Sequence, residues 1–188
     1  MKYLMRILLA SAALVPLAAT AQATDLAPNV PSDTAAYTGI YLRGDLGASW
    51  LNWGSATTNM AYVGDAGIGY QVDQNWRTDL TYNWTGSYNI APGSTLHTNI
   101  VMGNVYFDWK NSTPITPYLG VGAGYGWQWA EGGAVPNASG LAVGLRAGVA
   151  YDFTNNLALD VGYRFNDILV SGQNTPEHQI AAGLRVKF

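Results

Sequence analysis

The chain has 188 residues, a formal net charge of −3 and no cysteine. Without cysteine it can form neither a disulfide framework nor a thiolate metal site, and its acidic balance offers no basic surface to nucleic acid. Only 11% of its residues are charged, yet after the N-terminal segment no stretch reaches the roughly 18 consecutive apolar residues of a membrane-spanning helix. With 22 glycines and 12% aromatic residues, this leaves a single β-rich domain, either soluble or in a membrane.

The N-terminus has the three parts of a secretory signal. Its first six residues carry two positive charges, an apolar run follows from Ile7 to Ala19, and Ala21-Gln22-Ala23 matches a small-x-small cleavage site. The apolar run is shorter than the roughly 20 residues of a spanning helix, which disfavours the alternative of a retained membrane anchor. We therefore predict that residues 1–23 are a signal peptide, removed after Ala23 or after Ala21. Residues 24–37, which include two prolines, are expected to be a flexible leader.

From residue 38 onward, apolar side chains recur at every second position. In the last segment Ile180 and Leu184 lie out of phase with Arg185, as in a strand whose two faces have different surroundings. Ile100 and Met102 blur the pattern in the fourth segment. Each segment is about as long as a tilted crossing of a bilayer requires. The eight segments are residues 40–50, 62–71, 76–84, 101–109, 118–129, 141–153, 157–166 and 179–188.

The connections between these segments alternate in length. Short ones lie near residues 72–75, 110–114 and 154–156, and longer ones lie near residues 51–59, 86–96, 130–139 and 170–177. Short periplasmic turns and longer outer loops are typical of bacterial outer-membrane barrels. The alternation therefore favours an up-and-down barrel in a membrane.

The orientation of the two faces decides between a soluble and a membrane barrel. The apolar face carries most of the Trp, Tyr and Phe residues at strand ends, where two aromatic girdles would match the two interfaces of a bilayer. An eight-stranded barrel encloses a lumen barely wide enough for side chains, so we expect these rings outside. We predict an all-β fold, a closed antiparallel transmembrane β-barrel of about eight strands over residues 38–188, in the bacterial outer membrane. The expected girdles are Trp50, Trp84, Trp127 and Trp129 at one rim, and Tyr70, Trp76, Trp109, Phe153 and Phe188 at the other.

The opposite face holds nearly all the charge of the strands, with basic and acidic residues in equal number. An Arg or Lys at the lipid-facing midplane costs roughly 2–4 kcal/mol, whereas a balanced set inside a narrow lumen can pair and hydrogen-bond. We predict a structural charge network that fills the lumen; a proton path along paired acids such as Asp45 and Asp65 is the alternative. The predicted network consists of Arg43, Asp45, Asp65, Arg77, Asp79, Asp108, Arg146, Asp152, Asp160, Arg164, Arg185 and Lys187.

Several segments resemble the motifs of a known family. The first strand opens with Tyr37-Thr38-Gly39-Ile40-Tyr41, residues 116–124 read TPYLGVGAG, residues 148–154 and 159–165 read GVAYDFT and LDVGYRF, and the chain closes on LRVKF. This set resembles the opacity-type porin family, small eight-stranded outer-membrane β-barrel proteins related to the OmpA membrane domain. The opening segment departs from the family pattern at Arg43, where the pattern has glycine.

The resemblance implies an integral outer-membrane protein with surface-exposed loops and no shared catalytic activity. Its implied partners are outer-membrane lipids and lipopolysaccharide. During biogenesis they would include periplasmic chaperones and the barrel insertion machinery, and the C-terminus ending in Phe188 resembles the assembly signal that this machinery reads. The loop sequences carry no readable ligand code, so a surface ligand stays unspecified.

Little in the sequence indicates catalysis. His97 and His178 lack the recognisably spaced serine and carboxylate of a hydrolase, and two histidines alone are too few to bind zinc. The glycine-rich residues 120–126 lack the lysine of a phosphate-binding loop. We therefore predict a structural barrel that contributes to envelope integrity and is not an enzyme, with no cofactor and no metal. A narrow channel for small solutes and a lipid-modifying enzyme are the alternatives.

Overall fold

The computed structural model describes residues 38–53, 56–132, 136–170 and 174–188. The predicted signal peptide (1–23) and leader (24–37) lie outside these ranges. None of the described residues forms a helix long and apolar enough to cross a membrane. The strands of the described ranges are β1 (Gly39–Trp53), β2 (Ala56–Gln71), β3 (Trp76–Thr85), β4 (Tyr88–Ala91), β5 (Ser94–Asp108), β6 (Ile115–Glu131), β7 (Ala138–Asp152), β8 (Leu157–Leu169) and β9 (Thr175–Lys187).

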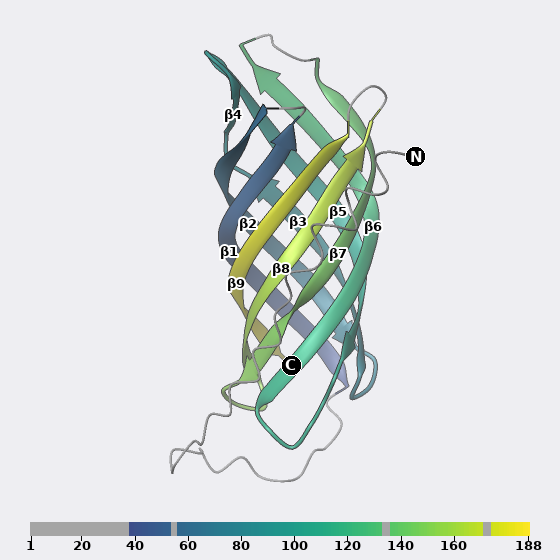
Figure 1. Ribbon diagram of the computed structural model, residues 1–188. Coiled ribbons are helices and arrows are strands. Elements are labelled where there is room, and N and C mark those ends of the chain that lie inside the picture. Colours follow the sequence, from purple (N-terminus) through teal and green to yellow (C-terminus); the bar gives the residue numbers. More distant parts are fainter. Residues whose placement is uncertain (1–37, 54–55, 133–135, 171–173) are drawn as a thin grey trace, which may run out of the picture. The chain divides into compact units, whose positions relative to one another are not determined.

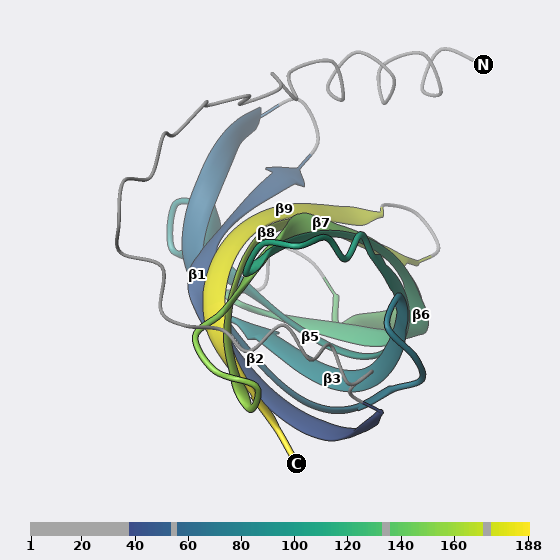
Figure 2. The ribbon, with the colours of Figure 1, turned by 90° about the horizontal axis from the view of Figure 1, so that it is seen from below.

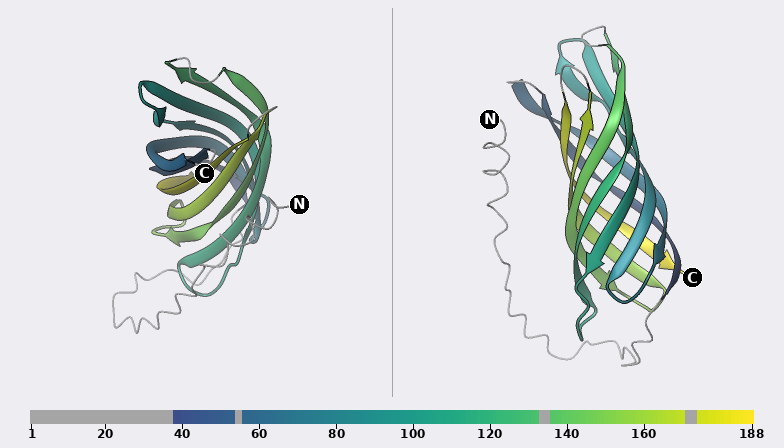
Figure 3. Two further views of the ribbon diagram at one scale, coloured as in Figure 1. Left: turned by 45° about the horizontal axis from the view of Figure 1, so that its top comes forward. Right: turned by 90° about the vertical axis from the view of Figure 1, so that its right-hand side faces the viewer.

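The strands close into a barrel, which Figure 1 shows from the side and Figure 2 shows from below. Neighbouring strands in the chain pair antiparallel except β3 and β4, and β1 also pairs with β9, so the ends of the sheet meet. The short strand β4 follows β3 and pairs with the same neighbour, β5, so the closed wall has eight strands. All strands tilt in one sense around the axis (Figure 3). An open sheet would have an edge whose backbone N–H and C=O groups find no partner in hydrocarbon, and closure removes that edge. The closed barrel confirms the predicted fold class.

The strands are longer at one end than the sequence pattern indicates. The short turns near 72–75, 110–114 and 154–156 are confirmed, but much of the expected long connections is strand: β1 runs to Trp53, β2 begins at Ala56 and β9 begins at Thr175. A crossing needs roughly 9–11 residues, and β6 has 17. The surplus forms hairpins that extend at the upper end of Figure 1. Beyond a bilayer both faces of a hairpin meet polar surroundings. The alternation of apolar and polar residues is therefore lost there, although the strands continue to pair through backbone hydrogen bonds.

The apolar face points outward along the whole wall, as predicted. In β3, exposed and buried side chains alternate strictly over most of the strand, with Leu80 54% exposed and Arg77 1% exposed. Leu46 on β1 is 72% exposed. A wall that exposes large aliphatic side chains all round and buries its charges is suited to hydrocarbon and not to water.

Aromatic side chains gather at two levels of this outer face. At the upper level Trp84 and Trp127 are both register partners of Asn99, and the ring of Tyr82 stacks on both indoles. At the lower level Phe107 makes edge contacts with Trp76 and with a second tryptophan, Trp109. These levels correspond to the predicted upper and lower girdles.

The lumen also holds large aromatic side chains, on the same inward face as the charges. Tyr41, Tyr106 and Tyr118 are buried inside, together with Tyr88 near the upper end. Glycines on facing strands make the room: a Cβ on Gly69 would lie 2.2 Å from Cζ of Tyr41, and a Cβ on Gly120 would lie 2.5 Å from Cδ1 of Tyr106. The alternating glycines of β6 therefore make room for bulky lumen side chains, as glycine at every second position of a strand indicates.

We expect Leu80→Arg to reduce the free energy of unfolding by about 2–4 kcal/mol, because it places a cation in the middle of the lipid-facing band. Val72→Arg is the matched control: Val72 is similarly exposed but follows the end of β2, where such a change costs about 0–1 kcal/mol. Urea titration of the protein in lipid vesicles measures both losses. Equal losses at the two positions would contradict the outward orientation of Leu80 toward lipid.

Candidate functional site: the filled lumen

The lumen is the only part of the described chain where charged side chains concentrate away from water. Its contents form four successive groups between the C-terminal end and the hairpin end of the barrel. We call them the rim pairs, the central network, the apolar layer and the polar cap. All four groups consist of side chains that point inward from the strands. Because successive side chains of a strand point to opposite faces, every second residue contributes to the lumen.

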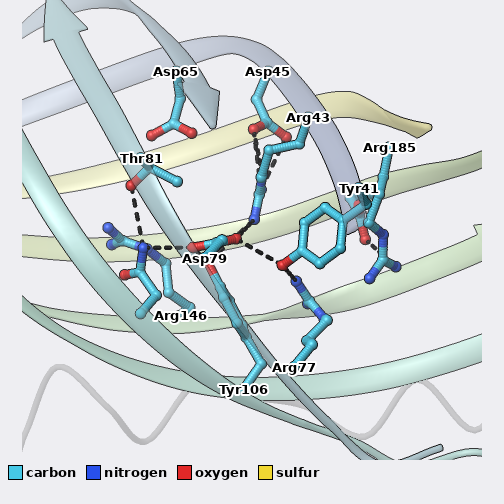
Figure 4. Close-up of polar contacts among 12 residues, drawn as sticks. Tyr41, Arg43, Asp45, Asp65, Arg77, Asp79, Thr81, Tyr106, Arg146 and Arg185 are labelled. Atoms are coloured by element: carbon cyan, nitrogen blue, oxygen red, sulfur yellow. Dashed lines mark hydrogen bonds and ion pairs between the residues drawn. The ribbon is translucent and has the colours of Figure 1, made fainter. Parts of the chain in front are cut away.

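The centre of the network is Asp79 on β3 (Figure 4). Its carboxylate accepts hydrogen bonds from Arg43 Nη1 at 3.2 Å and from Tyr41 Oη at 3.1 Å. Asn104 Nδ2 donates to the same carboxylate at 2.8 Å, and Tyr106 Oη does so at 3.4 Å. Four donors from two other strands, β1 and β5, thus converge on one carboxylate, which meets the requirement that a buried charge be both paired and hydrogen-bonded.

Arg43, the residue that departs from the family pattern, has a second carboxylate partner. Its Nε and Nη2 donate to the two oxygens of Asp45 at 3.0 and 3.1 Å, a bidentate pair. The register places Arg43 directly opposite Gly67, where a Cβ would already contact the Arg43 side chain. The missing glycine of the first strand is therefore matched by a glycine on β2.

A second arginine holds two acidic residues that would otherwise repel each other. Asp45 and Asp65 are direct register partners on β1 and β2. Arg164 on β8 reaches across the lumen, with Nη2 3.0 Å from Asp45 Oδ2 and Nη1 3.5 Å from Asp65 Oδ2. All three side chains are at most 5% exposed. Without the guanidinium, two carboxylates would face each other in a low dielectric, so Arg164 ties three strands together.

The rim pairs close the network toward the C-terminal end. Arg77 pairs with Asp108 at 3.0 Å and lies 3.8 Å from the centre of the Tyr106 ring, a cation–π contact. Arg185 pairs with Asp160 at 3.2 Å.

At the rim itself, Asp152 accepts from two lysines. Lys187 Nζ lies 2.6 Å away and Lys110 Nζ lies 3.1 Å away. Lys110 lies in a turn and was not among the predicted network residues. Eleven of the twelve predicted residues are thus found in ion pairs.

Arg146 is the predicted residue that the structure does not place beside a carboxylate. Its Nη1 donates to Asn166 Oδ1 at 2.6 Å, and its Nη2 lies 3.2 Å from the Met102 sulfur. It is the direct register partner of Arg164, yet only Arg164 reaches the acidic side of the lumen. Sequence alternation identifies which residues point inward, but not which of two neighbouring arginines reaches a distant strand.

The apolar layer covers this charged region. It consists of Ile100, Met102, Ala142 and Ile168, all at most 1% exposed, with Val170 packed against them. The residues that blurred the alternation of the fourth segment are thus inward-facing apolar residues. They place a dry layer across the lumen between the central network and the hairpin end.

The polar cap lies beyond the apolar layer and was missed by the sequence analysis. Glu177 is fully buried and accepts from Thr98 Oγ1 at 2.5 Å and from Gln179 Nε2 at 3.0 Å. Above it, Tyr88 donates to Ser49 Oγ at 2.5 Å and packs with Leu51, Ala61 and Leu96. The predicted eighth segment began at residue 179, so its signal stopped short of Glu177.

The two histidines lie apart from this interior. His97 Nε2 is 3.4 Å from Ser87 Oγ, and its ring stacks on Trp129. His178 Nδ1 is 2.6 Å from Tyr163 Oη. Among the contacts of the described residues, neither imidazole has a carboxylate partner, and no group of three metal-ligating side chains occurs in these ranges. The serine near His97 lies in the two-residue connection between β3 and β4, within the stretch that the sequence analysis expected to be a long loop.

Comparisons with known proteins agree with this architecture. A family model described as the outer membrane protein beta-barrel domain matches residues 7–188. A Brucella suis protein described as uncharacterized is 27% identical over 207 residues, which cover 77% of this chain and 72% of that protein. The outer membrane protein PagN of Salmonella typhimurium is 26% identical over 175 residues, covering 68% of this chain and 73% of its own length.

Solved structures show the same barrel. Neisserial surface protein A superposes with a TM-score of 0.70 at 25% identity, covering 80% of this chain and 97% of that one. Ail of Yersinia pestis superposes with a TM-score of 0.57 at 14% identity, covering 79% of this chain and 99% of Ail. The second likeness is one of fold alone.

We expect Arg164→Met to lower the free energy of unfolding by about 3–5 kcal/mol, because it leaves Asp45 and Asp65 buried and unbridged. Arg146→Met is the matched control, since it removes an equally buried guanidinium that has no carboxylate partner, and it should be neutral or stabilising. Adding Asp65→Asn to Arg164→Met should recover part of the loss. Urea titration in vesicles tests all three; equal losses for the two arginine variants would contradict the bridging role of Arg164.

Proposed function

This chain belongs to the outer membrane protein beta-barrel family and resides in the bacterial outer membrane, and from that premise we propose that it serves there as a sealed structural barrel. In this role the wall contacts lipid, the filled lumen prevents leakage, and the long hairpins face the cell exterior. Its partners are outer-membrane lipids and lipopolysaccharide. The barrel contributes to envelope integrity, and its hairpin ends are available for contacts at the cell surface.

The filled lumen is the observation that carries this proposal. An eight-stranded barrel has an interior just wide enough for side chains, and here that interior holds ion pairs, four tyrosines and an apolar layer. A solute would have to break charge-paired hydrogen bonds in the central network and then cross Met102 and Ile168. These costs argue against the alternative of a narrow channel.

A lipid-modifying activity has weaker support. Ser87 and His97 lie on the outer face, where a lipid substrate would be, but their separation is 3.4 Å and the described contacts include no carboxylate to orient the imidazole. Nucleophilic catalysis by serine relies on a base that a third group holds in place. We therefore propose a barrel without enzymatic activity.

The C-terminus supports the proposed contact with the insertion machinery. The Phe188 N–H donates to the Ile40 carbonyl at 3.0 Å, which joins the end of the last strand to the first. Its ring remains 68% exposed at the lower end of the wall. An exposed aromatic terminus beside the closing strand pair is accessible while the barrel assembles.

Deletion of the gene in its host tests this function, because a sealed barrel and a channel predict different changes in the permeability of the outer membrane. A sealed structural barrel predicts that loss of the protein increases uptake of large antibiotics, whereas a channel predicts slower uptake of small solutes. The orientation is tested with single cysteines, since the chain has none of its own. A membrane-impermeant maleimide should label Asn89→Cys on β4, but not Ser112→Cys in a lower turn, in intact cells. Reversed labelling or slower small-solute uptake would contradict the proposal.

A further inference from the structure

Glu177 in the polar cap is a buried acidic side chain without a cationic partner. It is fully buried, and none of the ion pairs among the described residues includes it. Its carboxylate accepts hydrogen bonds from the Thr98 hydroxyl at 2.5 Å and from the Gln179 amide at 3.0 Å. Both donors are neutral, so Glu177 lacks the compensation by opposite charge that a buried carboxylate requires.

Apolar side chains cover Glu177 on two sides. Its partner Thr98 lies on β5 between two inward-facing residues, Leu96 toward the hairpin end and Ile100 toward the centre of the barrel. Leu96 packs with Tyr88 in one apolar cluster, and Ile100 belongs to the apolar layer. An ionised carboxylate between these two clusters would have neither bulk water nor a cation beside it, so the closed cap favours the neutral acid.

The groups around Glu177 do not supply the missing charge. The titratable groups that act on it are Tyr88 on β4 and Asp167 on β8, and Asp167 is an acid as well. Arg164, the register partner of Gln179, is turned toward the aspartates of the central network. On β2 the nearest acid is Asp65, which is linked to Gln179 through Asn83. The inward residues at this level of the other strands do not titrate: Ser49 on β1, Thr85 on β3, Thr98 on β5, Gln128 on β6 and Ala142 on β7.

The proton on Glu177 is linked to closure of the cap. Glu177 is the register partner of Leu51 and lies one position beyond His178, the partner of the girdle residue Trp50. Burial raises the pKa of Glu177 to about 7, and the negative charge of Asp167 adds to the rise. A glutamate in water has a pKa of about 4.3. The closed cap therefore binds the proton more tightly than an open, hydrated cap, so closure weakens as the pH rises between these two values.

Tyr88 is the residue that closes the cap over Glu177. Its hydroxyl donates to Ser49 Oγ at 2.5 Å, and it is the only buried residue of β4, the short strand near the upper end of Figure 1. Asn89 and Ala91 are exposed, and Ile90 is half-buried against the same cluster. Among the described strands β4 forms a ladder with β5 alone. The position of β4 over the lumen mouth therefore depends mainly on one side chain.

We propose that Glu177 is a pH-sensitive latch for the hairpin formed by β4 and the start of β5. The neutral acid allows Tyr88 to dock and close the mouth of the lumen. Ionisation of Glu177 draws water into the cap, which releases Tyr88 and makes the hairpin mobile. The apolar layer and the central network lie below the cap, so the lumen stays sealed in both states. That the hairpin responds at the cell surface rests on the orientation in the proposed function, but the latch itself does not.

Amide exchange of the full protein in lipid nanodiscs tests the latch. After correction for the intrinsic effect of pH on exchange, the opening constant of residues 88–96 should rise by up to about tenfold per pH unit between pH 5 and 7. Residues 102–108 of the lower part of β5 are the internal reference and should show no such rise.

Two matched variants separate the latch from a general effect of pH. Glu177→Gln keeps the shape and hydrogen-bonding capacity of the side chain without its charge, so residues 88–96 should stay protected at every pH. Asp167→Asn removes the other acid near the cap and should leave the rise in place. Unboiled gel mobility verifies that each variant is folded.

A direct titration of Glu177 gives an independent readout. The chain has two glutamates, Glu131 and Glu177, so carboxyl-labelled glutamate gives two carbon signals, and Glu177→Gln assigns its own by removing it. We expect the Glu177 signal to titrate more than one pH unit higher in the folded protein than in urea.

A Glu177 carboxyl already ionised at pH 5, or the same rise in opening for Glu177→Gln as for the unchanged protein, would overturn the latch. Protection of residues 88–96 that does not change between pH 5 and 7 would overturn it as well. Reversed labelling of Asn89→Cys in cells would contradict the orientation and leave the nanodisc result unaffected.

Discussion

Hydrocarbon on one side of every strand is the constraint on which the rest of this structure depends. It forbids charge on the outer face, so each Arg, Lys and Asp of the spanning strands must enter a lumen only wide enough for side chains. Inside, each charge needs a partner because water is scarce. The convergence of four donors on Asp79 and the reach of Arg164 to two aspartates both answer this requirement. Glycines such as Gly67 and Gly120 are placed where these long side chains need room.

The same packing explains how a barrel can be stable and inert at once. Ion pairs from different strands fix the interior of the lower half, and the apolar layer around Met102 and Ile168 separates it from the polar cap. At the hairpin ends the strands extend past the bilayer, so their side chains are free of the requirement that the outer face be apolar. There a register change between β3 and β4 turns Tyr88 into the mouth of the lumen. The interior thus provides rigidity and the hairpins provide the surface for recognition.

The alternation of the sequence predicted the fold, the number of wall strands and the inward or outward position of side chains. It succeeded because one face meets lipid, so a residue such as Leu80 differs sharply from its neighbour Thr81. It failed where that contrast is missing: β4 and the upper part of β2 were taken as loops. It also could not show that Arg164 meets carboxylates while Arg146 meets Asn166. Such pairings depend on side-chain reach across a closed barrel, which no single strand encodes.

The central claim is that the paired charges and the apolar layer together close the lumen. Single-channel recording of the purified protein in planar bilayers measures this directly. The account predicts a flat baseline in concentrated salt at either polarity, for protein whose insertion is verified by its unboiled gel mobility after recovery. Reproducible conductance steps of one size from the inserted protein would show a continuous water path through the lumen and would contradict the account.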